Sequence, residues 1–128
     1  MNAQIDSSPE SQLSIAARNF LRDNTMKSLL GIPEDALDAV MALAFQLYQS
    51  GRYREVEVLC RGLVAADHTS WWSYALYAAT LRRLGKLTQA LSQAERGLVY
   101  EPQAPRLIAL RAEIRAALAA NSNRLRAA

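Results

Sequence analysis

Cysteine and histidine, the residue types that build most metal and nucleophilic sites, occur only once each in the 128 residues, as Cys60 and His68. A lone cysteine cannot form a disulfide within the chain, which agrees with a reducing compartment. A metal site needs about three or four ligands, and the sequence holds no cluster of such residues. We therefore expect Cys60 to be a small core residue and predict neither a metal nor another cofactor.

Sequence motifs for catalysis and phosphate binding are missing as well. The chain has no glycine-rich phosphate loop, no HExxH, no GxSxG and no CxxC pair. Each of these patterns marks a specific chemistry. We expect no catalytic residue and a function that is not enzymatic.

Long apolar runs are also absent, since none approaches the roughly 18 residues that a membrane-spanning helix needs. Residues 1–10 are polar and contain Asp6 and Glu10, whereas a signal peptide begins with a basic stretch followed by an apolar one. These patterns predict a cytoplasmic protein that does not insert into a membrane.

The sequence does contain an internal repeat. Gly51-Arg52-Tyr53 and Gly85-Lys86-Leu87 are 34 residues apart, and each lies between two runs with helical spacing of apolar residues. Glycine suits this place because a helix that ends in a left-handed residue accommodates no side chain there. Aligning the copies on the glycines pairs Val40 with Tyr74, Leu43 with Tyr77, Ala44 with Ala78 and Leu47 with Leu81. This period is typical of the tetratricopeptide repeat (TPR).

The fold class predicted from this pattern is all-α, with about two TPR helical hairpins, an additional N-terminal helix and a C-terminal capping helix. We expect a disordered leader over 1–10, an N-terminal helix and connector over 11–32, and a TPR domain over 33–120. Within the domain the repeats are about 37–70 and 71–104, the capping helix is 105–120, and 121–128 is a frayed tail. The expected repeat and capping helices are 34–50, 53–66, 71–84, 88–100 and 106–120.

The N-terminal helix carries an apolar stripe that must pack on something. Two alternatives stay open: the stripe packs on the first repeat, or it packs on a second copy of the protein. The candidate dimer contacts are Leu13, Ala17, Phe20 and Leu21.

The first helix of each repeat should line a concave face. By repeat geometry that face receives Asp38, Met41, Phe45, Tyr48 and Gln49 from the first copy, and Trp72, Ala75, Ala79, Arg82 and Arg83 from the second. Large aromatic residues and arginine carry much of the binding energy at protein interfaces. The candidate protein-binding groove therefore consists of Met41, Phe45, Tyr48, Gln49, Trp72, Arg82 and Arg83. For Phe45 and Trp72 the alternative is that they turn inward or pack under the N-terminal helix.

Charge is distributed unevenly along the chain. Residues 1–68 hold six Lys/Arg against nine Asp/Glu, and residues 69–128 hold nine against three. A basic half can bind an anionic partner such as nucleic acid. We favour a solvated helical surface, because the arginines are spread along the chain without a nucleic-acid-binding motif.

Residues 43–53 read LAFQLYQSGRY, and the pair Asp67-His68 follows about a dozen residues later. This pattern resembles the TPR chaperones of bacterial type III secretion, the class II (LcrH/SycD-like) family, over residues 33–118. The resemblance implies a small cytosolic protein that holds hydrophobic secretion substrates, mainly two pore-forming translocators, as extended segments in the groove. It implies groove roles for Phe45 and Tyr48, a packing role for Tyr53, and dimerisation through the N-terminal helix.

From the resemblance we expect a non-enzymatic chaperone or adaptor whose partner is a secretion-system polypeptide. With the third repeat reduced to one helix, that partner is a translocator or a smaller apparatus subunit. The alternative is a TPR scaffold that forms a homo-oligomer or part of a larger protein complex. A third hypothesis, a regulator that contacts nucleic acid, predicts binding that weakens steeply with added salt.

Overall fold

The computed structural model describes Ile15 and residues 24–127. The predicted leader and the candidate dimer contacts Leu13, Ala17, Phe20 and Leu21 lie outside the described residues, and so does Ala128. From residue 24 to residue 127 every regular element is a helix. The helices are α2 (Met26–Leu30), α3 (Glu34–Gln49), α4 (Tyr53–Ala66), α5 (Trp71–Arg83), α6 (Leu87–Tyr100) and α7 (Pro105–Ala127).

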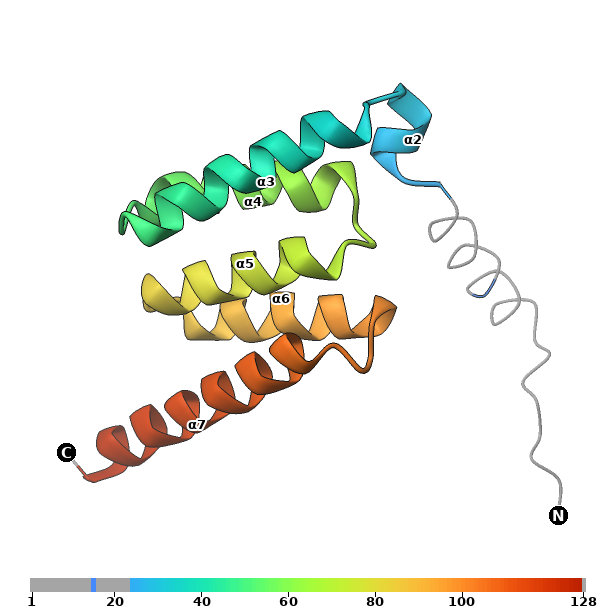
Figure 1. The fold of residues 1–128 in the computed structure, drawn as a ribbon. Coiled ribbons are helices and arrows are strands. Elements are labelled where there is room, and N and C mark those ends of the chain that lie inside the picture. Colours follow the sequence, from blue (N-terminus) through green and yellow to red (C-terminus); the bar gives the residue numbers. More distant parts are fainter. Residues whose placement is uncertain (1–14, 16–23, 128) are drawn as a thin grey trace, which may run out of the picture.

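The helices form two antiparallel hairpins followed by a single helix (Figure 1). The α3/α4 hairpin stacks on the α5/α6 hairpin, and α7 packs against the second hairpin. The predicted all-α fold of two helical hairpins and one further helix is confirmed in this part of the chain. Among the described helices, none combines the length and the apolar character needed to cross a bilayer.

The two repeat turns have the same geometry. Gly51 and Gly85 adopt φ values of 79° and 77°, in the left-handed region. The amide of the residue after each glycine bonds back to the helix, from Arg52 N to Leu47 O at 3.0 Å and from Lys86 N to Leu81 O at 2.8 Å. This arrangement closes the end of a helix and lets the next one start within two residues, which explains the repeated spacing.

The core lies between the hairpins and under α7. Its fully buried side chains include Val56, Cys60, Leu81, Leu107 and Ile114. The core role expected for Cys60 is therefore confirmed, and burial raises the pKa of its thiol to about 12. The small residues of the repeat pattern, Ala44 and Ala78, are also fully buried where helices approach each other.

The predicted frayed tail over 121–128 is wrong for its described part, because α7 continues without interruption to Ala127. The segment after Ala120 contains neither proline nor glycine, so nothing in it stops a helix. Arg124 also donates a hydrogen bond to Asn121 Oδ1 at 2.8 Å, one turn earlier. Arg124 and Arg126 place positive charge at the negative end of the helix dipole, which favours the additional turns.

The predicted connector contains a short helix, α2. The hydroxyl of Thr25 caps it by accepting a hydrogen bond from Ser28 N at 3.2 Å. Gly31 ends it in the left-handed conformation, with φ of 66°. The connector is thus a defined element that leads directly into α3.

Candidate functional site

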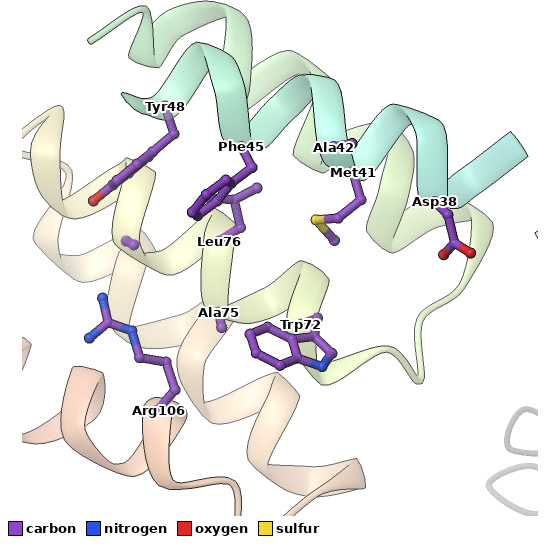
Figure 2. Close-up of a pocket in the computed structure, with 10 residues that line it drawn as sticks. Asp38, Met41, Ala42, Phe45, Tyr48, Trp72, Ala75, Leu76 and Arg106 are labelled. Atoms are coloured by element: carbon purple, nitrogen blue, oxygen red, sulfur yellow. The ribbon is translucent and has the colours of Figure 1, made fainter. Parts of the chain in front are cut away.

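The concave face of the hairpins holds a pocket of about 400 Å³ between α3, α5 and the start of α7 (Figure 2). Most of its wall is apolar. The described residues that line it are Asp38, Met41, Ala42, Phe45, Tyr48, Trp72, Ala75, Leu76, Ala79 and Arg106. The structure therefore brings together Met41, Phe45, Tyr48 and Trp72 from the predicted groove.

Phe45 and Trp72 are exposed to solvent over more than half of their surface, at 53% and 62%. The alternative that either residue turns into the core is wrong, while packing under the N-terminal helix concerns segments outside the described residues. Trp72 is held in place because its ring stacks on that of Trp71, with ring centroids 4.1 Å apart. Trp71 in turn packs against the core. The pocket thus presents an anchored indole and a phenyl ring to solvent.

Tyr48 is half-buried at one end of the pocket. Its ring meets that of Tyr53 edge to face, with centroids 5.3 Å apart. Its hydroxyl accepts a hydrogen bond from Arg83 Nε at 3.4 Å, and this bond raises the pKa of the Arg83 guanidinium. Tyr53 packs at the repeat turn, and Tyr48 joins α3 to α5.

Gln49, Arg82 and Arg83 are not among the described residues that line the pocket. Arg82 forms an ion pair with Glu113 of α7, and Arg83 bonds to Tyr48 as described above. Both arginines therefore connect neighbouring helices on the edge of the concave face. Their predicted contact with a partner stays a prediction.

Three lining residues were missed by the sequence analysis, namely Ala42, Leu76 and Arg106. Ala42 and Leu76 are equivalent positions of the two copies, 34 residues apart. Arg106 follows Trp72 by 34 residues, and Trp72 follows Asp38 by the same number. Carrying the repeat period into α7 a third time would have identified Arg106 as a groove residue.

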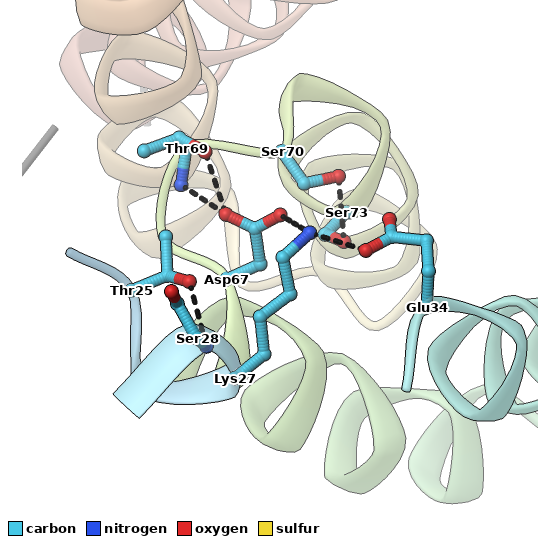
Figure 3. Close-up of polar contacts among 8 residues, drawn as sticks. All are labelled: Thr25, Lys27, Ser28, Glu34, Asp67, Thr69, Ser70 and Ser73. Atoms are coloured by element: carbon cyan, nitrogen blue, oxygen red, sulfur yellow. Dashed lines mark hydrogen bonds and ion pairs between the residues drawn. The ribbon is translucent and has the colours of Figure 1, made fainter. Parts of the chain in front are cut away.

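A polar cluster beside the pocket fastens the connector to the hairpin (Figure 3). Lys27 Nζ of α2 lies 2.6 Å from Glu34 Oε2 and 2.8 Å from Asp67 Oδ2. Asp67 also accepts hydrogen bonds from the Thr69 hydroxyl at 2.6 Å and the Thr69 amide at 3.1 Å. Asp67 of the Asp67-His68 pair therefore has a structural role, since it ties α2 to the loop between α4 and α5.

The charges of this cluster stabilise one another. Burial acts to raise the pKa of Asp67, but the hydrogen bonds from Lys27 and Thr69 outweigh it and hold that pKa below its ordinary value. The hydrogen bonds to Asp67 and then Glu34 raise the pKa of Lys27. Next to the cluster, the ring of His68 packs edge to face on that of Tyr100, with centroids 5.5 Å apart.

The chain is similar to known proteins in both sequence and structure, although no protein-family model matches it. It is 25% identical over 104 residues to low calcium response locus protein H of Yersinia pestis and of Yersinia pseudotuberculosis. The match covers 80% of this chain and 62% of each relative. The chain thus spans less than two thirds of the length of these curated relatives.

Two solved structures share the fold. SycD, a type III secretion translocator chaperone of Yersinia enterocolitica, gives a TM-score of 0.69 at 27% identity, over 71% of this chain and 68% of SycD. A T3SS complex from Aeromonas hydrophila gives a TM-score of 0.74 at 25% identity, over 82% of this chain and 71% of the matched chain. A second SycD structure is of an alternative dimer.

Proposed function

We propose that this chain, a homologue of low calcium response locus protein H with the fold of the SycD chaperone, is a non-enzymatic chaperone of bacterial type III secretion. It acts in the cytoplasm and binds a secretion-system polypeptide in the groove between α3, α5 and α7. An apolar segment of that polypeptide is buried in the groove, so that it neither aggregates nor assembles before export. The partner is a translocator or a smaller apparatus subunit.

The observation that carries this proposal is the pair of exposed aromatic side chains over a concave, mostly apolar pocket. Phe45 and Trp72 stand on neighbouring helices and face the same space in Figure 2. Burying one large apolar side chain contributes about 1.5–3 kcal/mol, and tryptophan is among the residues that most often dominate an interface. Contact of these apolar rings with water is unfavourable, and an apolar segment bound over them would remove that contact.

The test is co-expression of the chain with each translocator of a type III secretion system from the same organism, followed by measurement of the soluble translocator. The Phe45→Ala/Trp72→Ala double variant should lose the solubilising effect and weaken binding at least about thirtyfold. The matched control is Val58→Ala/Val99→Ala, because these valines are as exposed, at 59% and 58%, but lie on α4 and α6 outside the pocket. Equal loss in both double variants, or no loss in either, would contradict the proposal.

A specific observation favours self-association as a second function of the same chain. Helix α2 buries none of its residues, and Met26, Leu29 and Leu30 on it are exposed. SycD itself has been crystallised as an alternative dimer. We propose that α2 contributes to a contact between two copies, which Leu29→Glu/Leu30→Glu should weaken in light scattering after gel filtration. An unchanged mass would remove α2 from the contact.

A further inference from the structure

Only two of the ten described residues that line the groove pocket are charged, and their charges are opposite. Asp38 belongs to α3 and Arg106 to α7, and both are exposed. Neither side chain forms a hydrogen bond or an ion pair with another described residue, whereas the side chains of Arg82 and Arg83 nearby both do. Figure 2 places Asp38 at one end of the pocket and Arg106 toward the other, on the wall opposite Phe45 and Tyr48.

Arg106 occupies a place where a cation is unfavourable for the fold. It is the second residue of α7, whose described first turn holds no acidic residue. The start of a helix carries partial positive charge, so a guanidinium there is repelled. Helix α3 shows the usual arrangement, with Glu34 and Asp35 in its first turn. No ion pair or side-chain hydrogen bond within the described part of the chain offsets the unfavourable placement of Arg106.

The opposite end of the pocket is acidic. A second, smaller pocket adjoins the first and shares Asp38, Met41 and Trp72 with it. Glu34 and Asp67 also line this second pocket, but Lys27 pairs with both. Asp38 is thus the carboxylate of this wall that has no ion pair within the described chain.

We propose that the groove selects an apolar polypeptide segment that carries a basic side chain at one end and an acidic side chain at the other. The basic side chain pairs with Asp38 and the acidic one with Arg106, while the apolar stretch between them covers Phe45 and Trp72. The two charges fix the direction of the bound segment, whose basic end lies against α3 and whose acidic end lies against α7. This inference rests on the proposed function, because it names the chemistry of the segment that the same groove binds.

Charge complementarity supports this occupant over a purely apolar one. An apolar segment that covers the pocket excludes water from its ends, and an ion pair becomes stronger as its surroundings become less polar. An unpaired Asp38 or Arg106 beside such a segment would be desolvated without compensation. Oppositely charged ends on the partner avoid that penalty, and they disfavour partners with the reverse arrangement.

The test is a selection of random dodecapeptides displayed on phage against the immobilised full chain. The Phe45→Ala/Trp72→Ala variant is used to discard peptides that do not bind in the groove. We expect enrichment of apolar runs flanked by Lys or Arg on one side and by Asp or Glu on the other. Against Arg106→Glu the acidic preference should be lost, and against Asp38→Arg/Arg106→Asp the order of the two charges should reverse.

Fluorescence anisotropy of one selected peptide then measures the effect. Arg106→Glu should raise its Kd at least about tenfold, and replacing the acidic residue of the peptide by lysine should restore binding to that variant. Arg126→Glu is the matched control, because it makes the same charge change on the same helix about 30 Å away. The Tm of Arg106→Glu should be equal to or higher than that of the native chain, since an anion suits the start of α7. A fall of several degrees would show a structural role instead and overturn the inference.

The remaining outcomes separate the inference from the proposed function. Enrichment of apolar peptides without a charge preference would overturn the charge selection and leave groove binding standing. Failure to recover any peptide that depends on Phe45 and Trp72 would overturn both.

Discussion

Replacing each of two helical glycines by alanine is expected to change the stability of the protein in opposite directions. Gly62 lies in α4 and Gly97 in α6. Inside a helix alanine is favoured over glycine by up to about 1 kcal/mol. A Cβ placed at Gly62 would have no described atom within 4 Å apart from its own helix backbone and chain neighbours. Gly62→Ala should therefore raise the free energy of unfolding by about 0.5–1 kcal/mol.

At Gly97 the added Cβ meets two other helices. It would lie 2.7 Å from Leu107 Cδ1 of α7 and 2.8 Å from Tyr74 Cβ of α5. Leu107 is fully buried and the Cβ of Tyr74 is attached to the backbone of its helix, so a helix must move. Overpacking of this kind costs about 1–3 kcal/mol, which exceeds the gain in helix propensity. Gly97→Ala should lower the free energy of unfolding by up to about 2 kcal/mol.

The assay is urea unfolding of the two variants and the native chain, followed by far-UV circular dichroism. The midpoints of the two variants should lie about 1 M apart, because the free energy changes by about 1–3 kcal/mol per molar urea. Equal stabilisation by both substitutions would refute the close approach of α5, α6 and α7 at Gly97. It would also contradict the position of the start of α7, and with it that of Arg106, which directly precedes Leu107.

Three further predictions concern Asp67 of the polar cluster, the buried thiol of Cys60 and the buried carboxylate of Glu57. The pKa of Asp67 is lowered in the folded chain, so this carboxylate stabilises the fold above the unfolded pKa of about 3.9, and the contribution is lost as the pH falls through the lower folded value. Asp67→Asn should therefore lower the free energy of unfolding at neutral pH. It should also reduce the change of that free energy with pH in the acid range, measured in unfolding experiments. Cys60, with a pKa of about 12, should react with a thiol reagent at pH 8 only when the chain is unfolded in urea, and fast reaction of the folded chain would contradict its burial. Lys86→Met should lower the free energy of unfolding by about 1 kcal/mol, because the buried carboxylate of Glu57 loses the ammonium that lies 2.8 Å away and keeps, among the described residues, only the Arg61 guanidinium at 3.5 Å. Lys86→Arg should retain most of the stability.

Much of the fold follows from local sequence signals. Gly51 and Gly85 are the left-handed residues that end two helices, and their 34-residue spacing sets the hairpin stack. The helix after each turn begins at Tyr53 and Leu87, within a residue of its expected start. The continuation of α7 beyond Ala120 was not predicted, although residues 121–128 contain no proline or glycine that would stop a helix.

The site could be predicted only in part. The repeat register placed Met41, Phe45, Tyr48 and Trp72 on one concave face, and the structure brings these residues together around the pocket. Arg106 was missed because only two copies of the repeat were compared, and the last helix was interpreted as a cap and not as the first helix of a third copy. The pairing of Arg82 with Glu113 joins residues 31 positions apart, and no local pattern indicates such a contact.

The most direct test of the central claim is photo-cross-linking in the native cytosol, with p-benzoylphenylalanine placed at position 45, at position 72 or at the control position 58. Groove binding predicts a covalent adduct with a single secretion-system polypeptide from positions 45 and 72, identified by mass spectrometry, and none from position 58. Adducts formed equally well from all three positions, or only with a second copy of this chain, would contradict it.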